Sequence, residues 1–149
     1  MPAVVLIDTN VWVSAFVNPR GAPARVRKAF ASGEFQAVVS VPLLDELAEV
    51  LARPRIRDKY GLAEDEIAEF LRLLAQRSLQ IMPKGELHVC RDPDDDLLLE
   101  TALLGGARYV VSRDDDIKRD QDLVAQMEAR GITVLSIQRF LDRLESGSL

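Results

Sequence analysis

Residues 91–117 read RDPDDDLLLETALLGGARYVVSRDDDI, and this stretch decides the fold. It opens with four acids around Pro93, continues through the apolar segment LLLETALL and reaches Gly105 and Gly106. Acids and proline in a first turn, apolar residues in the middle and glycine at the end are typical of a helix. The β-branched segment RYVVS that follows is typical of a strand buried on both faces. The stretch therefore predicts a helix and then a strand, with acids before the helix and after the strand.

The same alternation extends in both directions along the chain. We expect strands at residues 3–7, 36–40, 79–82, 108–112 and 132–136. We expect helices at residues 22–33, 42–52, 63–76, 92–106, 121–130 and 137–144, with a polar connection over residues 113–120. Strands that alternate with helices predict an α/β fold, here a three-layer α/β/α sandwich with a mainly parallel central sheet. The length of 149 residues suits a single domain over residues 1–149.

The composition limits the chemistry that the protein can perform. The single histidine, His88, and the single cysteine, Cys90, exclude an internal disulfide and disfavour a zinc site of the usual type. A metal ion would be bound mainly by carboxylates, which select hard cations such as Mg²⁺ or Mn²⁺. No apolar run is long enough to span a bilayer and no signal-peptide pattern is visible, so we expect a cytoplasmic protein without a membrane partner.

The net charge of −5 is distributed unevenly. Without nine acids that we expect in or beside one site, 15 acidic residues would remain against 19 basic ones, so the rest of the surface is mildly basic. The charge balance therefore neither excludes a nucleic acid nor argues for one. The nine acids are Asp8, Glu46, Asp92, Asp94, Asp95, Asp96, Asp114, Asp115 and Asp116.

Two of these acids follow expected strands. Asp8 comes directly after the strand at 3–7, and Asp114 lies two residues past the strand at 108–112. In open α/β sheets, ligands bind beyond the carboxyl ends of the strands, so both acids are candidates for a site. Taken alone, either one is better explained by the ordinary preference of aspartate for strand ends and turns.

Glu46 occupies a particular position in the helix expected at 42–52. It lies about 100° from the centre of the apolar stripe, at the margin, whereas Asp45 and Glu49 lie near the opposite side. Glu46 is therefore the acid of this helix that is directed towards packed structure. The alternative is a border residue whose stem packs while its carboxylate stays in water.

The acids at residues 92–96 are too many for helix capping. Capping and the helix dipole account for one or two of them. The helix that they open is apolar nearly all round and is expected to be buried, so Asp96 at its entrance costs free energy unless it is paired or bound to a ligand.

Carboxylates from four segments can thus meet at one end of one sheet. One or two divalent cations would satisfy them, and two ions about 4 Å apart would orient a phosphodiester, activate a water molecule and stabilise the leaving oxygen. Such chemistry needs neither histidine nor a nucleophilic serine. A calcium loop of the EF-hand type is disfavoured because the acidic segment lacks its spaced ligands and its glycine.

Four segments together resemble the PIN domain, most closely its bacterial and archaeal branch of toxins from toxin–antitoxin systems. They are LIDTNVWVSA at 6–15, LLDELAEVLARP at 43–54, the stretch 91–117 and ITVLSIQRFL at 132–141. The resemblance implies an α/β/α sandwich and cleavage of single-stranded RNA that depends on Mg²⁺ or Mn²⁺. It also implies a homodimer and an antitoxin protein as a partner.

The resemblance assigns the metal-binding and catalytic acids by position. They are Asp8, Glu46, Asp96 and Asp114, with Asp116 as an accessory acid and with Asn10 and Ser112 as polar supports. Two assignments stay open. The triple run Asp114–Asp116 makes Asp116 an alternative to Asp114, and Asp95 competes with Asp96.

Two other functions remain possible on the sequence alone. A non-catalytic module of the same fold would bind RNA or a protein partner without cutting. A metal-dependent phosphatase with an aspartate nucleophile is disfavoured because Asn10 stands where a second aspartate is expected. Trp12 can stack on a base, but we expect it to pack in the core or at a dimer face.

Overall fold

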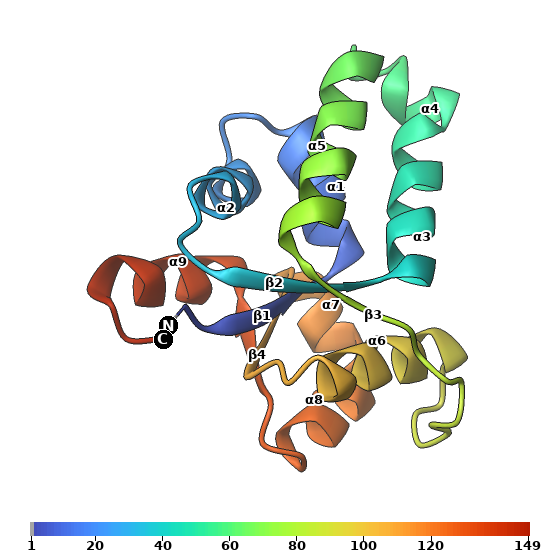
Figure 1. Ribbon diagram of the computed structural model, residues 1–149, viewed down its shortest axis with the longest axis vertical. Helices are drawn as coiled ribbons and strands as arrows, with labels where there is room; N and C mark the ends of the chain where they lie inside the picture. The colour runs from blue at the N-terminus through green and yellow to red at the C-terminus, as the bar shows by residue number, and fades with distance from the viewer. Residues whose placement is uncertain (1) are drawn as a thin grey trace.

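The computed structural model describes residues 2–149 and contains one five-stranded sheet in which every pairing is parallel. The strand order is β3-β2-β1-β4-β5, so the first strand of the chain lies at the centre (Figure 1). The strands are β1 (Val4–Ile7), β2 (Gln36–Ser40), β3 (Leu79–Ile81), β4 (Tyr109–Ser112) and β5 (Thr133–Ser136). The predicted fold class is confirmed. From β1 the chain adds β2 and then β3 on one side, and it then returns to add β4 and β5 on the other side. A topological switch point therefore lies at the carboxyl ends of β1 and β4.

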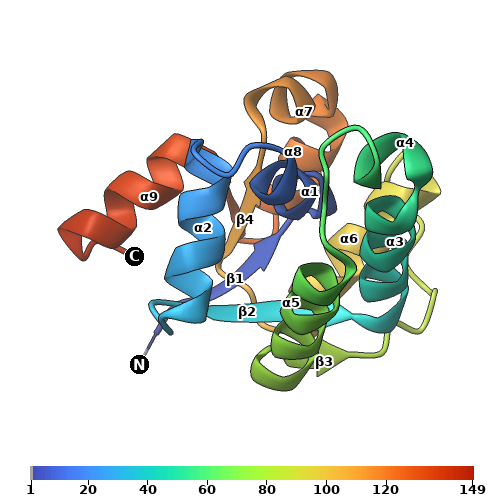
Figure 2. The same cartoon turned by 90° about the horizontal axis from the view of Figure 1, so that it is seen from above.

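Helices cover both faces of the sheet, as Figures 1 and 2 show. One face carries α1 (Thr9–Val17), α2 (Ala22–Ala31), α3 (Val41–Ala52), α4 (Pro54–Arg57), α5 (Glu64–Arg77) and α9 (Ile137–Ser146). The other face carries α6 (Pro93–Leu104) and α8 (Gln121–Glu128), while α7 (Asp114–Arg119) lies where β4 ends.

The two faces of the sheet form separate cores because side chains alternate along each strand. In β1, Val5 and Ile7 pack among the helices of the larger layer, whereas Leu6 packs against α6 and α8. Trp12 is 3% exposed and lies in the larger core, with its ring 5.7 Å from the ring of Phe30 and 5.1 Å from that of Phe70. Trp12 is therefore a core residue and not a surface for stacking a base.

Three short helices differ from the sequence expectation. The segment expected to be a polar connection contains α7, and α1 and α4 were not expected as helices. Helix α1 is rich in β-branched and aromatic residues, which have low helix propensity, but it buries Val11, Trp12 and Phe16 against the sheet. Tertiary packing therefore outweighs local preference there.

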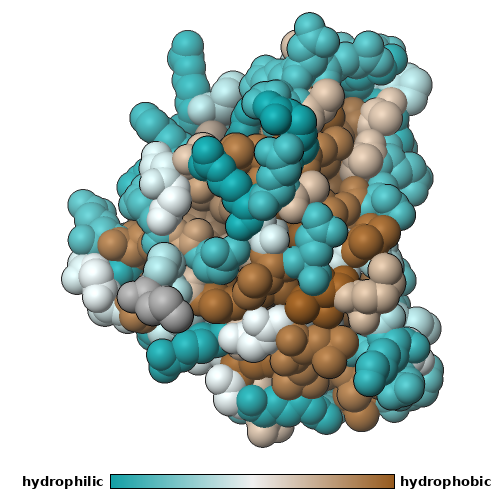
Figure 3. Space-filling model, in the orientation of Figure 1, coloured by the Kyte–Doolittle hydropathy of each residue, from teal (hydrophilic) through white to brown (hydrophobic). Residues whose placement is uncertain are grey.

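The surface carries an apolar area on the side seen in Figure 3, across the edge strand β3 and the C-terminal end of α6. Its exposed large side chains include Leu79, Met82, Leu103 and Leu104. Within residues 2–149, no helix is long and apolar enough to cross a membrane.

Candidate functional site

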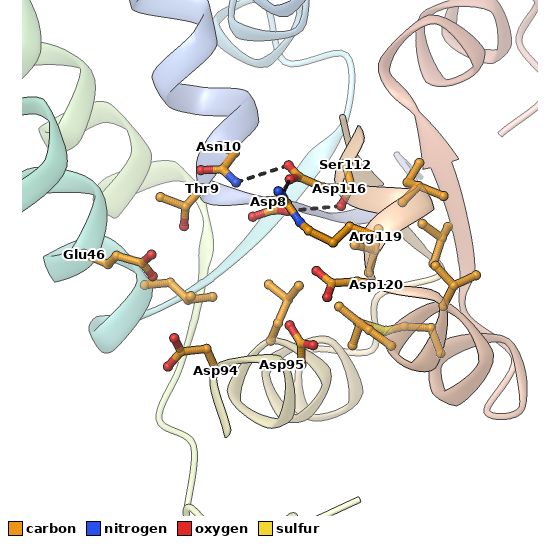
Figure 4. Close-up of a pocket in the computed structure, with 18 residues that line it drawn as sticks. Asp8, Thr9, Asn10, Glu46, Asp94, Asp95, Ser112, Asp116, Arg119 and Asp120 are labelled. Atoms are coloured by element: carbon orange, nitrogen blue, oxygen red, sulfur yellow. Dashed lines mark hydrogen bonds and ion pairs between the residues drawn. The ribbon is translucent and has the colours of Figure 1, made fainter. Parts of the chain in front are cut away.

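A cavity opens at the carboxyl end of the sheet, between the end of β1, helix α3 and helices α6, α7 and α8 (Figure 4). Its volume is about 160 Å³, which is room for roughly five water molecules or for a partly hydrated cation. Six carboxylates line it, together with polar and apolar side chains. The acids are Asp8, Glu46, Asp94, Asp95, Asp116 and Asp120.

Asp8 lies at the switch point, as the sequence indicated. Its backbone N–H continues the β1–β4 ladder by donating to the carbonyl of Val111 at 2.9 Å. It immediately precedes α1. The hydroxyl of Ser112 donates to Oδ2 of Asp8 at 3.2 Å. Burial and then the nearby charge of Asp116 raise the pKa of Asp8 to about 6, because both oppose ionisation of this carboxyl group.

Asp116 is 4% exposed and receives hydrogen bonds on both of its oxygens. The amide of Asn10 and Nε of Arg113 each donate to Oδ2 at 3.1 Å, and Nη2 of Arg119 donates to Oδ1. Burial opposes ionisation of Asp116, but the hydrogen bonds from Arg113 and Asn10 outweigh it, and the pKa of this carboxyl lies below its usual value. Asp116 is therefore held ionised in the cavity.

Asp114, which the sequence assigned as the fourth ligand, lies outside the cavity. It is the first residue of α7 and is exposed to solvent. Asp116 is two residues further along the helix and so lies about 200° away around its axis, on the side that faces the sheet. Of the two alternatives, the structure brings only Asp116 next to Asp8.

In helix α6, too, only some of the neighbouring acids line the cavity. Leu98 faces the cavity, and Asp94 and Asp95 lie four and three residues before it, on the same side of the helix. Asp95 therefore reaches the cavity. Burial and then Asp120 raise the pKa of Asp95 to about 6, so this carboxyl group too is crowded by like charge.

Asp96, the assigned third ligand, points away from the cavity into the segment before α6. Its Oδ1 accepts the backbone N–H groups of Val89 at 2.9 Å and Cys90 at 2.7 Å. Glu100, one turn later, accepts those of Lys84 and Gly85 at 2.9 and 3.0 Å. The bonds from Cys90 and then Val89 keep the pKa of Asp96 below its usual value despite burial. The free-energy cost of burying Asp96 is thus offset by backbone N–H groups and not by a cavity ligand.

Glu46 lines the cavity from α3 and shares a helix face with Leu43, three residues earlier. Its side chain approaches from the side opposite α7, as Figure 4 shows. Partial burial and then the charge of Asp94 raise the pKa of Glu46. The wheel position of Glu46 at the margin of the apolar stripe is what directs it there.

Three charged lining residues were not singled out as ligands or supports from the sequence: Asp94, Arg119 and Asp120. The sequence does contain a signal that places Arg119. The helix dipole favours acids in the first turn and bases in the last turn of a helix, and this order is met by Asp114–Asp116 followed by Lys118 and Arg119. A helix at this position places Arg119 one turn after Asp116.

The donor set suits a hard divalent cation, because every acidic group in the cavity is a carboxylate. The Cys90 thiol does not line the cavity, and burial raises its pKa to about 12. Over residues 2–149, no three acidic, histidine or cysteine side chains already lie at metal-binding distance from one point. The carboxylates line one cavity, but they are not gathered around one point in it.

The PIN domain family model matches residues 4–116, a span that includes the strands β1, β2 and β4 and the acids Asp8, Glu46, Asp95 and Asp116. The chain is a PIN domain. PIN domains are generally nucleases, which hydrolyse phosphodiester bonds and generally use divalent metal ions. An uncharacterized protein of Methanocaldococcus jannaschii is 28% identical to this PIN domain over 142 residues, which are 95% of this chain and 91% of that protein.

Proposed function

We propose that this PIN domain is a divalent-metal-dependent endoribonuclease that cleaves single-stranded RNA. The observation that supports the proposal most is the convergence of Asp8, Glu46, Asp95 and Asp116 from four separate elements on one cavity. In this proposal, Asp95 and Asp116 replace Asp96 and Asp114 as ligands, because only the former two line the cavity. The carboxylates would hold Mg²⁺ or Mn²⁺.

The bound cations would orient the phosphodiester and activate a water molecule for attack on phosphorus. The side chains of the chain prepare this in three ways. Ser112 fixes the orientation of Asp8, and Asn10 and Arg113 fix that of Asp116. The apolar wall of the cavity, which includes Leu98, limits the access of bulk water and so strengthens the electrostatic interactions inside.

The test is cleavage of a labelled single-stranded RNA with Mn²⁺, with Mg²⁺ and with EDTA, for the wild type beside Asp8→Asn. This change removes one carboxylate charge at nearly constant size. Asp45→Asn on the exposed side of α3 is a matched control, because Asp45 does not line the cavity. We expect metal-dependent cleavage that Asp8→Asn lowers by about 10²-fold or more and that the control leaves unchanged.

Other results would favour other functions. Folded, equally inactive proteins on several RNAs would favour a non-catalytic binding module. Release of phosphate from a phosphomonoester, without RNA cleavage, would favour a phosphatase. Equal cleavage by the wild type and Asp8→Asn would place the activity elsewhere or in a contaminant.

We also propose that the protein acts as the toxin of a toxin–antitoxin pair and assembles as a homodimer. The support is the resemblance of the motifs to that branch of the family. Induced expression of the wild type should arrest growth of a bacterial host, and expression of Asp8→Asn should not. Light scattering of the purified protein at several concentrations gives the oligomeric state.

A further inference from the structure

Arg119 is the basic side chain among the residues that line the cavity. The side chain leaves the last residue of α7 and turns back into the cavity, where Figure 4 shows it running between Asp120 and the pair Asp8 and Asp116. There its Nη2 donates to Oδ1 of Asp116. A guanidinium thus stands among carboxylates that attract cations.

The two oxygens of Asp116 are used differently. Oδ2 accepts two hydrogen bonds, one from Asn10, which lines the cavity, and one from Arg113, which does not. Oδ1 accepts one, from Arg119, which lines the cavity. Oδ2 is therefore the oxygen that positions the carboxylate, and Oδ1 is the oxygen that a cation in the cavity would contact.

The pair between Arg119 and Asp116 is suited to exchange. The Asp116 side chain is 5% exposed, whereas the Arg119 side chain is 66% exposed, so most of the arginine is already hydrated. Asn10 and Arg113 hold Oδ2 of the buried carboxylate independently of Arg119, so Asp116 keeps two hydrogen-bond donors when Arg119 leaves Oδ1. A neighbouring cavity of about 400 Å³, which Arg119 also lines, has room for the released side chain. Its other lining residues include the acids Asp92, Asp95, Asp120 and Asp122.

A divalent ion and a guanidinium cannot both occupy Oδ1, since two cations at one carboxylate oxygen repel each other strongly in a partly desolvated cavity. We propose that Arg119 is an internal counter-cation that holds Oδ1 of Asp116 in the metal-free protein and is exchanged for the divalent ion on loading. Arg119 therefore lowers the affinity of the site for metal. The inference rests on the proposed metal-dependent function of the cavity.

The test is Mn²⁺ binding to the full chain, measured by calorimetry and by the electron paramagnetic resonance signal of free Mn²⁺, without RNA. Arg119→Gln should bind Mn²⁺ about three- to tenfold more tightly than the wild type. Lys118→Gln is the matched control, because it makes the same charge change at the adjacent exposed residue, outside the cavity. Arg119→Lys keeps the charge and should bind close to the wild type.

A second measurement follows Arg119 itself. On addition of Mg²⁺, the side-chain Nε–H resonance of Arg119 should shift and show faster motion, while that of Arg113 should stay in place. Equal Mn²⁺ affinity of Arg119→Gln and the wild type, or an equal gain in Lys118→Gln, would overturn the exchange while leaving the metal site intact. Absence of Mn²⁺ binding in every variant would instead overturn the proposed function itself.

Discussion

Asp8 determines much of the electrostatics of the cavity, because it lies between the ends of β1 and β4 with Asp116 close by. Its raised pKa means that the folded protein binds the proton of this carboxyl more tightly than the unfolded chain does. The contribution of Asp8 to stability is therefore fully present below the unfolded pKa near 3.9 and is lost as the pH rises through about 6. At neutral pH the ionised group opposes folding of the metal-free protein.

Asp8→Asn should therefore stabilise the metal-free protein at pH 7, by about 2 kcal/mol, since the amide needs no ionisation in the buried position. The gain should shrink to nearly nothing at pH 4, where the wild-type carboxyl is also largely neutral. Urea unfolding in EDTA at both pH values measures the difference. A gain that is equal at both pH values would show that packing, and not charge, is responsible.

Single substitutions can also test which of the adjacent acids contribute to Mn²⁺ binding. Asp95→Asn and Asp116→Asn should weaken Mn²⁺ binding roughly tenfold to a hundredfold, because each removes a carboxylate from the cavity. Asp96→Asn and Asp114→Asn should change it by less than about threefold, because their side chains point elsewhere. Calorimetric titration of the four variants ranks them, and the reverse order would restore the ligands that sequence position alone assigned.

Among the elements, α6 serves both the cavity and the segment that precedes it. Asp94 and Asp95 face the cavity, and Asp96 and Glu100 hold the backbone of the long connection between β3 and α6. Because the same helix carries both functions, movement of this connection would change the position of Asp95.

Glu100→Ala should destabilise the protein by about 1–3 kcal/mol, since the backbone N–H groups of Lys84 and Gly85 lose a charged acceptor. Hydrogen exchange of the amides of Lys84 and Gly85 should rise together in this variant. Glu86→Ala, an exposed change in the same connection, is the control. Unchanged exchange at Lys84 and Gly85 in Glu100→Ala would show that the carboxylate does not hold this backbone.

At the scale of the whole molecule, the cavity gathers negative charge from segments that span most of the chain, from Asp8 to Asp120. Folding brings these charges together, so a bound divalent cation should stabilise the folded state and not the unfolded one. Stability and metal binding are thus linked.

Addition of Mn²⁺ at 100 times its dissociation constant should stabilise the protein by about 2.7 kcal/mol, which corresponds to a rise in Tm of roughly 5–10 °C. Differential scanning calorimetry with and without EDTA measures it, with NaCl at equal ionic strength as the control for screening. Asp116→Asn should lose most of the rise. A rise of the same size in this variant would place the stabilising ion away from the cavity.

The sequence by itself determined the fold class and indicated that the candidate site is built from carboxylates. Alternating β-branched and amphipathic segments specify a parallel α/β sandwich, and a chain with one histidine and one cysteine leaves carboxylates as the candidate metal ligands. Asp8 and Glu46 could also be located, because a strand end and the margin of an apolar stripe are local features of the chain.

Only the tertiary structure decided which neighbouring acids face the cavity. Helix α6 is apolar nearly all round, so its sequence does not reveal a preferred face, and a step of one residue turns a side chain by about 100°. The backbone N–H groups of Val89 and Cys90 meet Asp96 only after the connection before α6 has folded back onto the helix. The contact between Arg119 and Asp116 likewise depends on α7 being a helix. A helix of six residues is not stable by itself in water, so its packing at the end of β4 stabilises it.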